Sequence, residues 1–163
     1  MMSENYAVIN GNRIELTNEQ VKALGIKKNN PFERVAKSEK YCYIDGLDEI
    51  HWFSDDRGQC DNDSFECSNY FNDEGFAKQV ALHQLLYRKL LKFAWDNEAE
   101  DIEWDHNNIH YYIYYDCYLN SFCIGTSYNC KNANIFFSEK DAAQRAIKEV
   151  VEPFVKEHPE FVW

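Results

Sequence analysis

The sequence contains few residues that break regular structure and few basic residues. Its 163 residues include 6 glycines and 3 prolines, which excludes collagen-like, low-complexity and linker-like chains. No apolar run approaches the roughly 20 residues needed to cross a bilayer. The N-terminal residues lack the basic stretch followed by an apolar stretch that typifies a secretory signal. We therefore expect a cytoplasmic protein with no membrane partner and with reduced cysteines.

Motifs that would indicate catalysis or a bound cofactor are also missing. The chain has no glycine-rich phosphate loop and no G-x-S-x-G sequence, and its six cysteines lack C-x-x-C spacing. His106, Asn107, Asn108 and His110 include residue types that metal nucleases use, but their spacing fits a polar turn that enters a strand. The acids in 55–63 lack the regular alternation of a calcium-binding loop. We predict no enzymatic activity, no cofactor and no metal site.

What the sequence does contain is acid concentrated in two segments. Acidic residues outnumber basic ones 28 to 17, and the net charge is −11. Residues 45–74 hold ten acids and one base, residues 96–105 hold six acids and no base, and the rest of the chain is net positive. Such segments repel a phosphate backbone and attract a basic surface. We therefore predict no direct binding to nucleic acid, and a basic protein as the partner.

Local patterns predict a small N-terminal unit. Apolar runs at 6–9 and 13–16 flank Asn-Gly, the dipeptide favoured in two-residue hairpin turns. Thr17 and Gln20 have the spacing of a capping box, which predicts a short helix from about Asn18 to Leu24. Pro31 can then open a further helical turn.

Two similar halves follow, each with an aromatic strand, a second strand, a short strand that ends in Phe, a capping residue and a long helix. The expected strands are 41–44, 49–53 and 69–71 in the first half, and 109–115, 118–126 and 135–137 in the second. Asn72 and Ser138 are the expected helix caps. Residues 54–68 are expected to form a long solvated loop.

This pattern predicts an α+β fold built from duplicated strand–strand–strand–helix units. We expect one antiparallel sheet with both long helices on one face, preceded by the small N-terminal hairpin and helix. Within this one compact domain, the expected segments are 1–40 for the N-terminal unit, 41–95 for the first repeat, 96–108 for an acidic linker and 109–163 for the second repeat.

Tyr111, Tyr112, Tyr114 and Tyr115 place tyrosines on both faces of one expected strand. One face is expected to lie in the core. The other is either an exposed binding stripe, since tyrosine is enriched at interaction surfaces, or a face covered by the N-terminal hairpin or by a second copy of the chain. The sequence leaves these options open, a homodimer among them.

Five motifs carry a resemblance to a known group of proteins. They are Asn30-Pro31-Phe32-Glu33-Arg34-Val35, Tyr41-x-Tyr43-Ile44, Asn69-Tyr70-Phe71, Tyr111-Tyr112-Ile113-Tyr114-Tyr115-Asp116 and Phe136-Phe137-Ser138-Glu139-x-x-Ala142. Through them the chain, from Asn30 to its end, resembles small accessory proteins encoded in phages and prophages of Firmicutes. None of the motifs is catalytic. The resemblance implies a mobile-element protein that acts inside a bacterium, and such proteins include inhibitors of host defence, anti-CRISPR proteins among them.

These observations lead to two functional hypotheses. The first is a phage-encoded, non-enzymatic inhibitor of a host defence nuclease, which mimics DNA and occupies a basic, nucleic-acid-binding surface. Its expected partner-binding residues are the acids Asp55, Asp56, Asp61, Asp63, Glu66, Glu100, Asp101, Glu103 and Asp105, with Trp52 and Trp104 as apolar anchors. The alternative is a sponge protein that binds a nucleotide immune signal in a site lined by tyrosines and basic residues.

Overall fold

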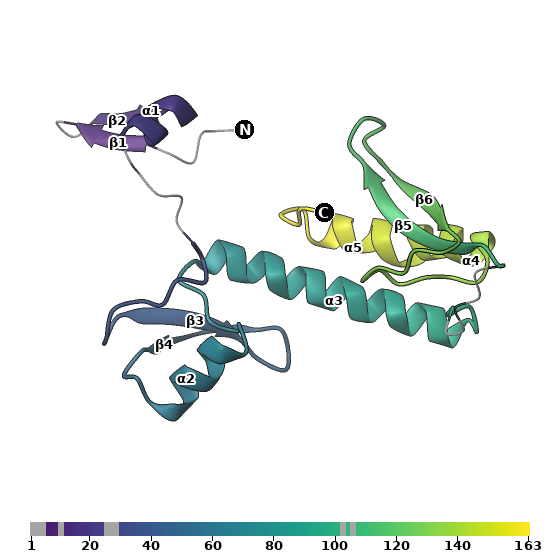
Figure 1. Ribbon diagram of the computed structural model, residues 1–163, viewed down its shortest axis with the longest axis horizontal. Coiled ribbons are helices and arrows are strands. Elements are labelled where there is room, and N and C mark those ends of the chain that lie inside the picture. The colour runs from purple at the N-terminus through teal and green to yellow at the C-terminus, as the bar shows by residue number, and fades with distance from the viewer. Residues whose placement is uncertain (1–5, 10–11, 25–29, 102–103, 105–106) are drawn as a thin grey trace.

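The computed structural model of the protein describes residues 6–9, 12–24, 30–101, 104 and 107–163. Two hairpin-containing units lie at the two ends of one long helix, and a small N-terminal unit lies apart from them (Figure 1). None of the helices in these described residues combines the length and the apolar character that a membrane crossing requires.

The N-terminal unit has the predicted hairpin and helix. Strands β1 (Tyr6–Ile9) and β2 (Asn12–Glu15) pair antiparallel, and α1 (Asn18–Ala23) follows. The capping box is confirmed, because the Gln20 amide donates to Thr17 Oγ1 and the Thr17 amide donates to Gln20 Oε1. The Asn10-Gly11 turn lies outside the described residues.

The helical turn expected after Pro31 does not form. The Phe32 amide donates to the side chain of Asn30 over 3.1 Å, and the Glu33 amide donates to its carbonyl over 2.9 Å. Asparagine side chains compete with helix formation in this way, and the result here is a turn. This turn places Arg34 where its side chain can reach the next unit.

The first larger unit has three layers. Strands β3 (Lys40–Ile44) and β4 (Ile50–Ser54) pair antiparallel, and Phe71 adds a single bridge to Cys42. On one face of the hairpin lies α3 (Glu74–Asp96), which buries a cluster made of Cys42, Ile44, Phe71, Ala77 and Ala81. On the other face lies α2 (Gln59–Glu66) (Figure 1).

The helix α2 replaces most of the solvated loop that was expected over 54–68, so that prediction is wrong. The expected cap of α3 is also one residue off. Asp73, with extended backbone, accepts from the Phe76 amide over 2.8 Å. Asn72 instead donates its side-chain amide to the carbonyls of Asn30 and Glu33.

The second larger unit packs along most of α3, from Gln79, which bonds to Glu160 and Val162, to the buried Ala94. Strands β5 (His110–Asp116) and β6 (Ser121–Ser127) pair antiparallel, and Phe137 bridges Tyr111. The following helical run comprises α4 (Lys140–Ala146), a π-helical turn η1 (Ile147–Val151) and α5 (Glu152–Glu157). Its N-cap residue is Glu139, whereas Ser138, the expected cap, bonds to the carbonyl of Ala99.

Pro153 accounts for the π-helical turn. A proline within a helix has no amide hydrogen, and its ring clashes with a carbonyl of the preceding turn. The chain widens just before it, and the Glu152 amide donates to the carbonyl of Ile147, five residues earlier. The helix therefore continues past Pro153, and Val151 and Phe154 stay buried. Pro153 therefore changes the local pitch of the helix without ending it.

The α+β class is confirmed, but the single sheet is not. The described residues form separate two-stranded antiparallel sheets, β1–β2, β3–β4 and β5–β6. The third strand expected in each half is reduced to a one-residue bridge, at Phe71 and at Phe137. The long helix α3 separates the two hairpins. It contacts α4 and η1, and its buried leucines share one core cluster with Ile113 of β5.

Candidate partner-binding surface

The acidic segment 55–66 is built around one buried carboxylate, Asp55. Its side chain has 0% exposure and accepts from the guanidinium groups of Arg34, at 2.8 and 3.0 Å, and of Arg57, at 2.9 Å. The Arg57 amide and the Tyr70 hydroxyl complete its hydrogen bonds. The Arg34 guanidinium is the main reason that the pKa of Asp55 lies far below its usual range.

Asp61 is also turned inward, as the third residue of α2. Its carboxylate accepts from the amides of Gly58 and Asp56, which caps the helix, and from the Tyr41 hydroxyl over 2.9 Å. The side chains of Tyr41 and Tyr70 stack at 4.0 Å between their ring centroids. Burial raises the pKa of each tyrosine to about 12, and the hydrogen bonds to Asp61 and Asp55 add to the shift.

These contacts correct part of the predicted binding set. Asp55 and Asp61 were expected to project from a solvated loop toward a partner. Both are instead buried, because Arg34, Arg57 and Tyr41 supply charged or polar partners inside the protein. They position α2 against the hairpin and are not available to an external basic surface.

The remaining acids of this segment stay exposed. Asp56, Asp63 and Glu66 are all solvent-accessible, and none of the ion pairs among the described residues involves them. Asp63 accepts one hydrogen bond from the neighbouring Gln59. The adjoining strand β4 exposes large apolar side chains, with Trp52 at 44% and Phe53 at 53% of their area, and α2 exposes Phe65. We call the exposed residues Trp52, Phe53, Asp56, Asp63, Phe65 and Glu66 the β4–α2 surface. Trp52, which faces Cys42, lies on its α3 side, and Phe53, which faces Tyr41, lies on its α2 side.

The second acidic segment lies at the other end of α3 and is partly buried. Residues 99–101 run beside 136–138, with the Asp101 amide bonded to Phe136 and the Ser138 amide bonded to Ala99. Glu100 is half-buried, and its Oε2 atom has no hydrogen-bond partner among the described residues. Asp101 pairs with the buried His110. Glu103 and Asp105 lie outside the described residues.

Trp104 packs against its own unit. Its ring stacks on His110 with 3.7 Å between centroids, meets the edge of Phe136 and lies under the ammonium group of Lys131. It was expected to be an exposed anchor, but it is half-buried. His106, from the polar turn, lies outside the described residues.

The two acidic segments therefore do not form one continuous patch. A helix of 23 residues such as α3 is about 35 Å long, and α2 and residues 99–101 lie near its opposite ends (Figure 1). A partner surface that covers the β4–α2 surface would not reach Asp101 without spanning the helix. The first segment is the better candidate, because among the described residues it exposes Asp56, Asp63 and Glu66, whereas the second exposes Asp96, which pairs with Lys92, and Glu98.

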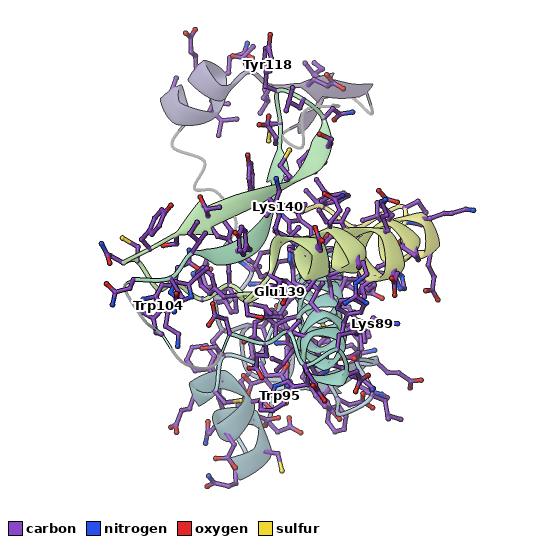
Figure 2. All side chains as sticks on the ribbon, turned by 90° about the vertical axis from the view of Figure 1, so that its right-hand side faces the viewer. Lys89, Trp95, Trp104, Tyr118, Glu139 and Lys140 are labelled. Carbon is purple, nitrogen blue, oxygen red and sulfur yellow. The ribbon has the colours of Figure 1, made fainter. Side chains whose placement is uncertain are left out.

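The tyrosine-rich strand β5 is largely covered. Tyr111 and Ile113 pack on the main core cluster, while Tyr112 lies on the opposite face, over Gly125 and against Phe136. Tyr114 is the exposed member of the predicted stripe. Beyond it, Tyr118 is 95% exposed at the tip of the β5–β6 hairpin (Figure 2). Most of the stripe thus belongs to the fold.

A small apolar cavity of about 240 Å³ lies between α3 and β5, with the C-terminal residue Trp163 at its wall. His83, Leu86, Tyr87 and Ile113 contribute to its lining, and its described lining includes no lysine or arginine. Sites for drug-sized ligands are usually ~300–1,000 Å³. The cavity therefore lacks both the volume and the positive charge that a nucleotide would need.

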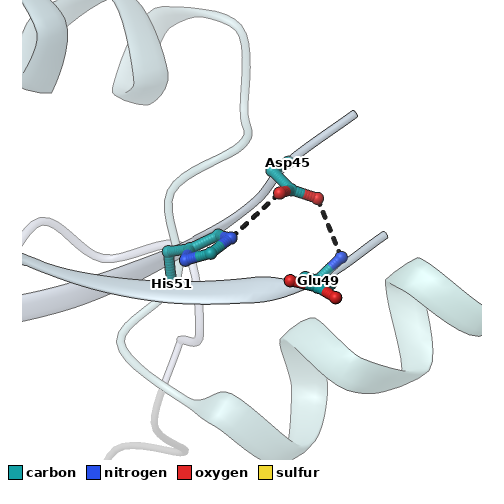
Figure 3. A group of neighbouring side chains, drawn as sticks. All are labelled: Asp45, Glu49 and His51. Atoms are coloured by element: carbon teal, nitrogen blue, oxygen red, sulfur yellow. Dashed lines mark hydrogen bonds and ion pairs between the residues drawn. The ribbon is translucent and has the colours of Figure 1, made fainter. Parts of the chain in front are cut away.

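A group that could hold a metal ion lies at the turn between β3 and β4, although no metal site was predicted from the sequence. One ligand atom each from Asp45, Glu49 and His51 lie within 4.8 Å of one another (Figure 3). Imidazole and carboxylate are ligands for several divalent metals. The signal was present as D-x-x-x-E-x-H across a Gly-containing turn, which brings the three positions together.

The hydrogen bonds of this group also have a structural role. Asp45 accepts from the amides of Leu47 and Glu49 and from His51 Nε2, at 2.8–2.9 Å. The Glu49 amide is the main cause of a lowered pKa of Asp45, followed by His51. These bonds close the turn, and they hold two of the three side chains in place without any ion.

No protein-family model, curated protein or solved structure matches this chain, so the functional argument depends on its own residues.

Proposed function

We propose that this protein is a phage-encoded, non-enzymatic binding protein that inhibits a bacterial defence nuclease, in the manner of an anti-CRISPR protein. In this proposal the β4–α2 surface occupies a basic site that would otherwise hold nucleic acid. The observation that carries the proposal is the exposure of three carboxylates and three aromatic rings on one short segment. Aromatic anchors surrounded by charge are typical of protein interfaces.

The buried network beneath the surface supports this assignment. Arg34, Arg57 and Tyr70 fix Asp55, and Tyr41 fixes Asp61, so α2 is held rigidly on the hairpin. A surface that is ordered before binding loses less entropy when the partner arrives. The buried Asp55 and Asp61 thus support the surface from below. In this proposal Asp56, Asp63 and Glu66 make the charge contact with the partner.

The proposal also explains a difference between the two halves of the chain. We propose that both halves derive from one strand–strand–strand–helix unit, since the Phe bridged to each hairpin lies two residues before the helix cap, as in Phe71–Asp73 and Phe137–Glu139. The first half has α2 within residues 55–70, where the second has only 128–136. Insertions in repeated units often carry the binding surface.

The alternative, a sponge for a nucleotide signal, has less support. The cavity beside Trp163 is small and has no lysine or arginine in its described lining. A larger cavity of about 520 Å³ includes Lys78, but Asp48, Glu74 and Glu160 in its lining would repel a phosphate. The exposed tyrosines Tyr114 and Tyr118 lie on the β5–β6 hairpin and do not line this cavity. Thermal-shift measurements with cyclic nucleotides and ADP-ribose test the alternative, and an increase in melting temperature with any of them would favour it.

The test of the main proposal is a binding assay against purified CRISPR effector nucleases, at low and high salt and with competing target DNA. The triple variant Asp56→Lys, Asp63→Lys, Glu66→Lys should weaken binding by about 10- to 100-fold and remove inhibition. A matched control, Glu149→Lys, Glu152→Lys, Glu157→Lys, changes the net charge equally on exposed positions of the C-terminal helix. Equal loss in both variants would mean that net charge alone matters, and unchanged inhibition in the first would refute the proposal.

A further inference from the structure

The two outer edges of the β3–β4 hairpin differ in their main-chain hydrogen bonds. On the outer edge of β3, Cys42 exchanges both main-chain hydrogen bonds with Phe71, each at 2.8 Å. Ile44 on the same edge donates its amide to the side chain of Asn69 over 2.9 Å, and Asn69 returns a bond to the Ile44 carbonyl over 2.7 Å. The outer edge of β3 is therefore satisfied within the chain.

The alternation of main-chain groups along the paired strands leaves the outer edge of β4 open. Trp52 faces Cys42 and Ile50 faces Ile44 in the antiparallel register. Main-chain groups in an antiparallel pair alternate between facing the partner strand and facing away. Since Cys42 and Ile44 direct theirs away from β4, the groups of Trp52 and Ile50 point outward as well, and β4 has no second strand beside it in the described part of the chain.

Among the residues that the structure describes, this open edge has none of the usual protection. Edge strands are normally blunted by lysines, prolines, bulges or a covering element. The strand β4 contains Ile50, His51, Trp52, Phe53 and Ser54, with no charged side chain other than a titratable histidine and no proline. Trp52, Phe53 and Ser54 are exposed. An uncharged aromatic edge with free donors and acceptors is suited to accept another strand.

The charges at the two ends of the edge select the occupant. Exposed Glu49 precedes β4 and exposed Asp56 follows it. If a second copy paired antiparallel about Trp52, the exposed Glu49 of each copy would lie beside the exposed Asp56 of the other, so like charges would meet at both ends. A basic segment meets complementary charge at both ends instead.

We infer that β4 accepts an extended, lysine- or arginine-containing segment of the partner as an added strand. Main-chain hydrogen bonds to Ile50 and Trp52 would supply the docking, and the side chain of Trp52 would cover an apolar residue of the segment. This inference rests on the proposed function, because it specifies how the β4–α2 surface engages a basic partner.

The test uses the intact protein with a synthetic peptide of alternating lysine and valine, and the same peptide with glutamate in place of lysine. Backbone NMR should show shifts centred on β4, and slower amide exchange at Ile50 and Trp52, with the lysine peptide alone. Shifts confined to α2, or equal shifts with both peptides, would overturn the inference.

Two proline variants distinguish main-chain hydrogen bonding at the β4 edge from contacts of its side chains. Trp52→Pro removes an outward amide without breaking a bond to β3, and it should weaken peptide binding about tenfold beyond Trp52→Ala. The matched control is Thr126→Pro on β6. Thr126 is exposed and faces Tyr111, whose main-chain groups bond to Phe137, so the amide of Thr126 also points outward. This control should leave binding unchanged. Binding that survives Trp52→Pro would overturn the inference, and the exchange measurement decides the case if that variant fails to fold.

The outcomes distinguish this inference from the proposed function. Nuclease inhibition that needs Asp56, Asp63 and Glu66 but survives Trp52→Pro keeps the function and rejects the added strand. Peptide addition at β4 without any nuclease inhibition keeps the added strand and rejects the function. A dimer in analytical ultracentrifugation that disappears in Trp52→Pro would make the occupant a second copy, and it would overturn the choice of a basic segment.

Discussion

The phenolic hydroxyl of Tyr70 donates to Asp55 over 2.9 Å, and this contact joins the end of β4 to the segment that leads into α3. Tyr70 also stacks on Tyr41, whose hydroxyl bonds to Asp61 of α2. Two aromatic rings and two carboxylates thus connect α2, the hairpin and the approach to α3. The ion pairs of Asp55 with Arg34 and Arg57 lie at the centre of this arrangement.

Replacing Asp55 should destabilise the protein strongly. Asp55→Asn removes the charge that balances Arg34 and Arg57, and breaking a buried ion pair on one side costs about 3–5 kcal/mol. Urea denaturation measures the change in the free energy of unfolding. The control is Asp56→Asn, an exposed neighbour, which should change that free energy by less than about 0.5 kcal/mol. Similar effects for the two variants would contradict the buried-pair interpretation.

Acid should destabilise the wild-type protein through the same residue. The pKa of Asp55 is lower in the folded protein than in the unfolded chain, where an aspartate titrates near about 3.9. The folded state therefore binds this proton more weakly, so the stabilisation is complete above the unfolded pKa and is lost as the pH falls below about 5. Denaturation midpoints measured from neutral to acidic pH test this. Asp55→Asn should flatten the acidic limb, and an unchanged limb would assign the acid sensitivity to other groups.

Much of the fold could be predicted from local patterns, because the decisive contacts are close in sequence. The capping box at Thr17 and Gln20 needs only three residues of spacing. The strands β3, β4 and β5 are rich in aromatic residues, and the helix α3, which ends at Asp96, has a broad apolar stripe. The single bridges at Phe71 and Phe137 were expected as strands, since an isolated Phe-ending run does not reveal how many residues will pair.

The candidate site was harder to predict, because its burial depends on distant residues. Asp55 lies within an acidic run and looks like a surface residue, and Arg34, which buries it, lies 21 residues earlier in the chain. The helix α2 has a polar sequence that gives little apolar periodicity. Its position depends on Asp61 and Tyr41, a contact between residues 20 apart. Tertiary contacts of this kind override local propensity.

A glycine on β6 should be sensitive to the smallest substitution. A Cβ atom added at Gly125 would lie 2.4 Å from the ring of Tyr112, on the neighbouring strand. Gly125→Ala must displace that ring and should cost about 1–3 kcal/mol. Gly46 has no atom within 4 Å of an added Cβ, so Gly46→Ala should have little effect. Thermal unfolding compares the two variants, and the double variant Gly125→Ala, Tyr112→Ala should show a non-additive effect.

The six cysteines should react with a thiol reagent in an order set by burial. Cys60, Cys67, Cys117 and Cys130 are exposed and should react first. Cys42 is fully buried, and burial raises the pKa of its thiol to about 11, so it has little of the reactive thiolate. It should react last, and only when the β3–β4 hairpin opens.

Asp55→Asn should accelerate this slow reaction of Cys42, because the variant weakens the unit in which Cys42 is buried. Cys42→Ala should abolish the slow phase while leaving the fast phase intact, which assigns the phase to this residue. A mass-spectrometric time course of labelling measures the rate of the slow phase in Asp55→Asn and its loss in Cys42→Ala. Early labelling of Cys42 in the wild-type protein would contradict the packing of β3 between α2 and α3, on which the β4–α2 surface depends.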